Sequence, residues 1–230
     1  FFPDHADGLR ICISRIRKAS HPENQGRHLS KKRNRIQSIR HLHLTLSAYR
    51  HFGENMSRIR LPDVSSMSNE QKKQYDRFPS NLVRALLVTT SSTKGYISLG
   101  ASFPAGQLAD KDREMVILRI GALSKSAYER MQHLPLARKA GWTDEEIGKL
   151  ENGTPYSERE KDILAFVDEC VRNVKVRTGT FNRVRQYYDE TQIAELTLMI
   201  GHYMMTARFL ETLEVDLDEC ATSWDAVSGQ

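Results

Sequence analysis

Residues 108–147 read LADKDREMVILRIGALSKSAYERMQHLPLARKAGWTDEEI, and this stretch decides the fold. Its first half, residues 110–124, carries apolar side chains around most of a helical surface, beginning at Met115. An apolar surface that wide predicts a deeply buried helix. Asp110 or Asp112 is expected to cap the helix at its N-terminus.

A second helix is expected over residues 126–140, because Gly141 is placed to end it. Thr-x-x-Glu and Ser-x-x-Glu spacings at 143–146 and 157–160 are typical of capping boxes and predict two more helix starts. Helices are also expected over residues 70–75, 81–90, 181–188 and 192–215, with the helix that starts at 157 running to 174. Residues 95–108 carry Gly100, Pro104 and Gly106 and are expected to be a helix end and loop. The fold class is therefore all-α, a single domain of six to eight helices in antiparallel hairpins.

The net charge of +5 over 230 residues comes entirely from the first quarter of the chain. Residues 1–55 hold eleven Lys and Arg against four Asp and Glu, which leaves 23 against 25 for residues 56–230. The net charge of the larger part is −2, so nucleic acid is not expected as a partner. No apolar run approaches the ~18 residues of a membrane helix, and no membrane contact is expected.

Residues 1–55 are expected to be a basic, disordered leader, because they lack sustained apolar periodicity. Three interpretations of the leader stay open: translated upstream or fragment-derived sequence, a transit-peptide-like arm, and a basic arm for nucleic acid. Residues 56–230 are expected to form the folded domain. We expect a cytoplasmic protein, or a mitochondrial one if the leader is a genuine transit segment.

The folded part contains two candidate proton shuttles, His133 and His202, because the other six histidines lie in residues 1–55. Glu129 and His133 are four residues apart and share one helix face. A carboxylate beside an imidazole orients the ring and holds its proton, which suits general acid–base catalysis near neutral pH. Such a pair is also common on solvated helices, where it contributes only about 0.2–0.5 kcal/mol. No His-x-x-x-His spacing occurs, and no metal site is expected.

Residues 108–147 resemble the core motif of the carboxymuconolactone decarboxylase family, which includes the alkyl hydroperoxide reductase D-type (AhpD-like) proteins. Residues 200–213 (IGHYMMTARFLETL) resemble the last helix of that family. The resemblance covers most of residues 75–217 and implies an AhpD-like fold. The matching features are Arg113–Glu114, Ile117–Leu118–Arg119, Tyr128–Glu129, His133, Ala137–Arg138, Ala140–Gly141 and residues 144–147.

The D-type reductases carry Glu-x11-Cys-x2-Cys-x3-His, in which the cysteines are the redox pair and Glu and His relay protons. Here the spacing from Glu114 to His133 is kept, but Ser126 and Glu129 stand in the cysteine positions. A hydroxyl and a carboxylate cannot form a disulfide or a sulfenic acid. The resemblance therefore favours the decarboxylase-like branch.

That branch implies a cofactor-independent acid–base enzyme, a carboxy-lyase similar to 4-carboxymuconolactone decarboxylase, acting on a small carboxylated lactone or ring compound. We interpret His133 as the proton shuttle, Glu129 as its partner or the base, and Glu114 as a second carboxylate that tunes the pair. The candidate substrate-binding residues are Ser126, Tyr128, Arg119, Arg208 and His202.

Each of the last three candidates has an alternative role. Arg119 and Arg208 offer bidentate groups for a carboxylate, or else form structural ion pairs. His202 reaches the pocket, or else is a hydrogen-bonded core residue.

Two alternative functions stay open, and the resemblance also implies an assembly. The alternatives are an alkylhydroperoxidase-type antioxidant protein, disfavoured by the missing Cys-x-x-Cys, and a non-catalytic binding protein. The resemblance implies a homo-oligomer, a trimer or a hexamer, with a small-molecule carboxylate as the other partner.

Overall fold

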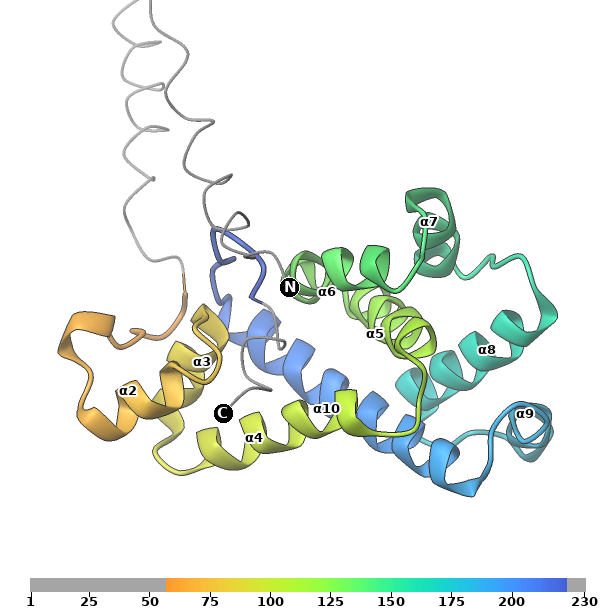
Figure 1. Cartoon of the computed structure of the whole chain (residues 1–230), viewed down its shortest axis with the longest axis horizontal. Coiled ribbons are helices and arrows are strands. Elements are labelled where there is room, and N and C mark those ends of the chain that lie inside the picture. The colour runs from red at the N-terminus through yellow and green to blue at the C-terminus, as the bar shows by residue number, and fades with distance from the viewer. Residues whose placement is uncertain (1–56, 223–230) are drawn as a thin grey trace, which may run out of the picture. The chain divides into compact units, whose positions relative to one another are not determined.

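The computed structural model describes residues 57–222, and within them it has nine α-helices and no strand (Figure 1). The predicted all-α class is confirmed, although the expected number of helices was too low. The expectation for residues 1–55 lies outside the described residues.

No helix of the described part is long and apolar enough to cross a membrane. The helices are α2 (Asn69–Tyr75), α3 (Asn81–Leu86), α4 (Ser92–Ser102), α5 (Asp110–Ser124), α6 (Ala127–Lys139), α7 (Asp144–Asn152), α8 (Glu158–Asn173), α9 (Thr178–Val184) and α10 (Glu190–Leu213).

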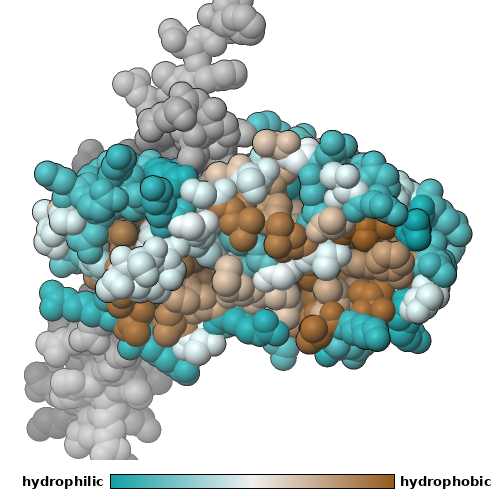
Figure 2. Space-filling model, turned by 90° about the horizontal axis from the view of Figure 1, so that it is seen from below, coloured by the Kyte–Doolittle hydropathy of each residue, from teal (hydrophilic) through white to brown (hydrophobic). Residues whose placement is uncertain are grey.

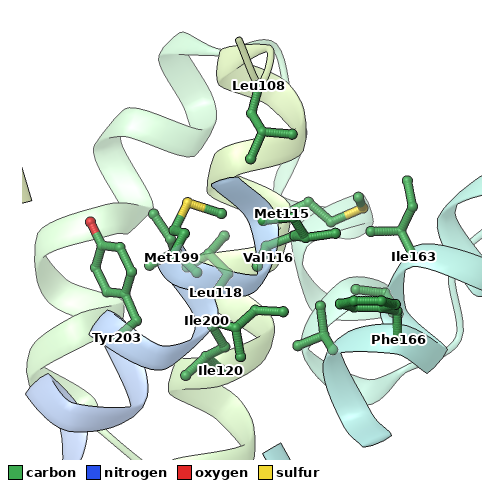
Figure 3. Packing of buried hydrophobic residues seen from close by; sticks show 14 of the residues in the cluster. Leu108, Met115, Val116, Leu118, Ile120, Ile163, Phe166, Met199, Ile200 and Tyr203 are labelled. Carbon is green, nitrogen blue, oxygen red and sulfur yellow. The ribbon is translucent and has the colours of Figure 1, made fainter. Parts of the chain in front are cut away.

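Helix α5 lies at the centre of the packing and contacts α6, α7, α8 and α10. Its apolar residues from Met115 to Ile120 are almost wholly buried, as the wide apolar surface predicts. Figure 3 shows Met115, Val116 and Leu118 meeting Met199 and Ile200 of α10. The long helix α10 runs beside α5, so these two helices carry the core that positions the site (Figure 1).

The predicted capping boxes are present at the starts of α7 and α8. The Ser126 hydroxyl accepts a hydrogen bond from the Glu129 backbone N–H and caps α6, and Gly141 follows that helix with a φ of +94°. Ser126 therefore fixes the start of α6 after the turn from α5, and Gly141 lies in the turn from α6 to α7.

The expected cap of α5 was wrong. Its N-cap residue is Ala109, with no side-chain hydrogen bond. The Asp112 carboxylate instead accepts two hydrogen bonds, at 2.8 and 2.6 Å, from the Arg159 guanidinium of α8. A guanidinium fork matches a carboxylate better than one backbone N–H does, so the pairing between helices prevails over the local cap.

Residues 95–108 also differ from the expected helix end and loop. Helix α4 continues through Gly95 and Gly100, and a 3-10 turn, Phe103–Ala105, follows it. Ile97 is completely buried and packs in a cluster with Phe78, Val83 and Leu87. This burial outweighs the cost of about 1 kcal/mol for each glycine inside a helix.

The expected bounds of the last two helices were shifted. Helix α9 is Thr178–Val184, and α10 begins at Glu190 because Asp189 and Gln192 form a capping box. Glu214, with a φ of +48°, ends α10 two residues earlier than expected.

Arg119 of α5 joins α7 and α8. Its guanidinium donates to both carboxylate oxygens of Asp168, each at 2.7 Å, and to the Glu151 carbonyl oxygen at 2.6 Å. Gly153 ends α7 with a φ of +75°, and a Cβ there would lie 2.8 Å from Nη2 of Arg119. The glycine thus provides both the left-handed turn and the space for the guanidinium.

Gly153→Ala should lower the free energy of unfolding by about 2 kcal/mol, because a left-handed alanine is strained and its methyl group displaces Arg119. The matched control is Gly148→Ala in the same helix, where a Cβ meets nothing within 4 Å. That control should raise stability by about 1 kcal/mol. Denaturant unfolding measures both, and equal effects of the two substitutions would contradict this description.

Candidate active site

The hairpin of α5 and α6 brings Glu114 and His133 into direct contact. Nδ1 of His133 lies 2.8 Å from Oε2 of Glu114, and both side chains are almost fully buried. Burial lowers the pKa of His133, but the Glu114 carboxylate opposes it with its charge and its hydrogen bond. The net result is a raised pKa, so the imidazole holds its proton more firmly than usual.

Glu129 faces the other nitrogen of the same ring. Its Oε2 lies 3.7 Å from Nε2 of His133, beyond hydrogen-bond distance, and its buried Oε1 has no partner among the described residues. Burial raises the pKa of Glu129 to about 7, with smaller contributions from the charges of Glu211 and Glu114, while His133 opposes the rise. The imidazole therefore lies between two carboxylates, and one of these titrates near neutral pH.

A cavity of about 70 Å³ gives access to this cluster. Glu114 and His133 line it, whereas Glu129 is not among the lining residues and lies behind the imidazole. Phe103, Pro104 and Leu136 form an apolar part of the cavity wall. Acid–base groups beside an apolar wall interact more strongly than in water, because the local dielectric constant is low.

Arg113 brings a positive charge to the cavity that the sequence interpretation missed. Its Nε lies 3.6 Å from Oε1 of Glu114, and its Nη2 donates to Asp110 at 3.0 Å. Its Nη1 is buried without a hydrogen-bond partner among the described residues. Arg113 was part of the matching motif, in the pair Arg113–Glu114. The motif alone does not tell which arginine of the helix faces the cavity.

Two of the predicted substrate-binding residues have other partners. Ser126 caps α6 through its buried hydroxyl. The Tyr128 hydroxyl donates to Asp218 and accepts a hydrogen bond from the Leu82 backbone N–H at 3.0 Å. Neither residue lines the cavity beside His133. Both hold the helix that carries Glu129 and His133.

The other three predicted substrate-binding residues also lie away from this cavity. Arg119 forms the structural ion pair with Asp168, the alternative that the sequence left open. Arg208 is exposed on α10. His202 is buried against the rings of Tyr96 and Phe103, and burial lowers its pKa to about 4. Its Nδ1 has no hydrogen-bond partner within the described range, so the expected hydrogen-bonded core histidine is only half right.

The two cysteines of the described residues stand apart from the cavity lining. Cys170 lies half-buried on α8 against the main hydrophobic cluster, and Cys220 is exposed. Burial raises the pKa of the Cys170 thiol, which reduces its thiolate fraction. Within residues 57–222, no group of three or more His, Cys, Asp or Glu side chains is placed to hold a metal ion.

The fold and this cluster define an all-helical protein with a buried carboxylate–imidazole–carboxylate site. Residues 97–169 match the sequence model of the carboxymuconolactone decarboxylase family. The resemblance to that family is therefore confirmed, over the part of the chain that holds Glu114, Glu129 and His133. Curated protein sequences give no significant match.

Solved structures with a similar fold bear different descriptions. An AhpD-core, peroxidase-related protein from Ralstonia eutropha JMP134 is 14% identical, with a TM-score of 0.63 over 72% of this chain and 94% of that chain. A peroxidase-related protein from Silicibacter sp. TM1040 is 15% identical, with a TM-score of 0.62 over 77% and 96%. A variant of the debrominase Bmp8, in complex with 2,3,4-tribromopyrrole, is 12% identical, with a TM-score of 0.60 over 72% and 94%. At these identities the likeness shows the AhpD-like fold alone.

Glu129→Gln should change the pH dependence of stability. Because the pKa of Glu129 is raised from 4.5 to about 7, the native state keeps a proton that the unfolded chain releases. The stabilisation from this group is complete below pH 4.5 and is lost as the pH rises through 7. The neutral glutamine avoids this loss, so the variant should gain stability relative to the unchanged protein between pH 5 and pH 8, on the order of 3 kcal/mol.

Thermal unfolding of the two proteins at pH 5 and pH 8 measures the difference. A difference that stays constant between these pH values would show that Glu129 is not the buried, titrating carboxylate described above.

Proposed function

We propose that this chain is a cofactor-independent acid–base enzyme similar to 4-carboxymuconolactone decarboxylase, acting on a small carboxylated lactone or related ring compound. The observation that carries the proposal is the 2.8 Å contact of Glu114 and His133 at the wall of a cavity, with Glu129 behind the imidazole. A Glu–His pair on a solvated helix would not have two buried carboxylates around its imidazole. Burying carboxylates costs desolvation free energy, and such clusters are typical of functional sites.

The geometry supports a division of roles among the three residues. Both nitrogens of His133 face carboxylates, and Glu114, 2.8 Å from its Nδ1, lines the cavity beside it. We therefore assign Glu114 as the group that exchanges a proton with the substrate and His133 as the shuttle. Glu129, with a pKa of about 7, sets the charge of the pair near neutral pH.

Arg113 is the group that we assign to substrate anchoring. Its buried, unpartnered Nη1 suits a carboxylate oxygen. An arginine that held the departing carboxylate would stabilise the reactant more than the transition state, which does not raise the rate. We therefore assign it to a second acidic group that stays on the ring.

The reaction is balanced with one proton from the protein. The bond between the ring carbon and the departing carboxylate breaks, CO₂ leaves, and the electron pair moves into the conjugated lactone carbonyl. A proton from Glu114 then forms the new C–H bond, and the carbonyl is restored. The net change is one carboxylate and one proton converted to CO₂ and a C–H bond, with no oxidant or reductant.

The antioxidant alternative finds less support at this site. Positions 126 and 129 hold no thiol, and neither cysteine of the described residues lines the cavity. Peroxide reduction by a dithiol needs two thiols in reach of each other. The peroxidase-related descriptions of the structural neighbours therefore supply no second candidate.

A trimer or hexamer of this chain stays a prediction. An apolar groove between α4 and α10 offers a surface for such an assembly, with Leu198 and Met205 about half exposed. Figure 2 shows apolar side chains gathered on the face seen from below.

Glu114→Gln should lower kcat for 4-carboxymuconolactone by about 10² or more, because the amide keeps the shape of the side chain but exchanges no proton. CO₂ release and the loss of lactone absorbance measure turnover, and thermal unfolding verifies the fold. Glu190→Gln, at an exposed position of α10, is the matched control and should be unaffected. Full turnover by the Glu114 variant would refute the assignment.

Arg113→Gln should raise KM for the same lactone by about tenfold or more, because a buried charge-assisted contact contributes about 1.5–3 kcal/mol. The comparison variant is Arg208→Gln, which removes the exposed arginine that the sequence also suggested. Steady-state kinetics with both variants decides between the two positions. A raised KM in the Arg208 variant alone would contradict the assignment of Arg113.

A further inference from the structure

We propose that Tyr203 is a further catalytic residue, whose hydroxyl donates a hydrogen bond to the lactone carbonyl oxygen as negative charge develops there. This inference rests on the proposed function and goes beyond it, because it assigns the group that stabilises the intermediate. Neither the sequence motif nor the acid–base cluster requires a tyrosine at this position.

Tyr203 lies on α10 and lines the same cavity as Glu114, His133 and Arg113. Its ring meets the His133 imidazole edge to face, with 5.1 Å between the ring centroids and an interplanar angle of 83°. Figure 3 shows the ring at the edge of the apolar cluster with its hydroxyl directed away from the aliphatic side chains. The aromatic body therefore belongs to the core, while the polar end faces the site.

The hydroxyl of Tyr203 has no hydrogen-bond partner among the described residues, which sets it apart from three other buried or partly buried tyrosines. The Tyr96 hydroxyl is bonded to Thr206, that of Tyr128 to Asp218, and that of Tyr188 to Arg159. Buried tyrosine hydroxyls normally find such partners, because an unpaired one costs about 1–3 kcal/mol. A hydroxyl left unpaired at a cavity wall is available to a ligand.

The surroundings of Tyr203 keep the phenol protonated. Burial raises its pKa well above the usual value, and the negative charges of Glu129 and Glu114 raise it further. The group is therefore a neutral donor throughout the working pH range, and it does not supply the proton that Glu114 transfers. A neutral donor beside apolar walls strengthens its hydrogen bond as the acceptor gains charge.

Three polar groups at the cavity then serve three parts of one substrate. Arg113 holds the acidic group that stays, Glu114 reaches the carbon that gains a proton, and Tyr203 binds the carbonyl oxygen. The substrate class that fits this set is a γ-lactone whose carbonyl is conjugated with the carbon that loses its carboxylate. A ring acid without a carbonyl leaves Tyr203 unused.

The first experiment is Tyr203→Phe, assayed with 4-carboxymuconolactone. Removing one donor to a developing oxyanion should lower kcat by about 10²–10³ with little change in KM. The pH dependence of kcat should keep its position, because Glu114, Glu129 and His133 remain. Tyr96→Phe is the matched control, since Tyr96 is partly buried and bonded to Thr206 but does not line the cavity. An unchanged kcat in Tyr203→Phe, or equal losses in both variants, would overturn the inference.

The second experiment needs no variant and uses 5-oxotetrahydrofuran-2-carboxylate, a saturated carboxylated lactone, as the probe. On binding to the unchanged protein, the lactone carbonyl stretch should shift to lower wavenumber, and Tyr203→Phe should abolish the shift. Binding without a shift would overturn the inference and leave the proposed function standing. Failure of the probe to bind, together with no turnover of 4-carboxymuconolactone, would overturn both.

Discussion

The contact between Nδ1 of His133 and Oε2 of Glu114 is the constraint on which the rest of the structure depends. It joins α5 to α6 through charged groups that have left water, and such groups are tolerated only when they are paired. The helix that carries Glu114 must therefore be buried, which explains the apolar residues around most of α5. The imidazole gains a raised pKa from the same contact, so one interaction both fixes the hairpin and prepares the acid–base pair.

The two positions that carry cysteines in the D-type reductases hold Ser126 and Glu129 in this chain, and these residues have other structural roles. Ser126 caps α6, and Glu129 places a second carboxylate beside the imidazole. Without thiols at positions 126 and 129 the site has no redox pair there, and its carboxylates and imidazole suit the proton transfer proposed above. A fold shared with proteins that bear different descriptions does not by itself select the reaction.

Much of the fold was predictable because its determinants are local. Residues 110–124 became α5 with the predicted bounds, and Thr143 and Ser157 cap the helices that their spacing indicated. The failures have tertiary causes. The burial of Ile97 keeps α4 helical through two glycines, and Arg159 draws Asp112 away from the helix end. In both cases the interacting residues are far apart in the sequence, so no local sequence pattern predicts the contact.

Part of the candidate site was also predictable from the sequence, and part of it was not. The four-residue spacing placed Glu129 and His133 on one face, and the family motif added Glu114. The position of Arg113 at the cavity was not predictable, because Arg113 and Arg119 look alike in sequence. Arg113 lines the cavity, whereas Arg119 pairs with Asp168. Tyr203 is one of many apolar or aromatic residues on α10, and only the structure shows that it lines the cavity.

The most direct test of the central claim is an NMR titration of the His133 imidazole in ¹⁵N-histidine-labelled protein, assigned with His133→Gln. His133 should keep its proton above pH 6.5, and Glu114→Gln should lower its pKa, because the neighbouring carboxylate is gone. A His133 pKa near 6.5 that the Glu114 substitution leaves unchanged would contradict the account.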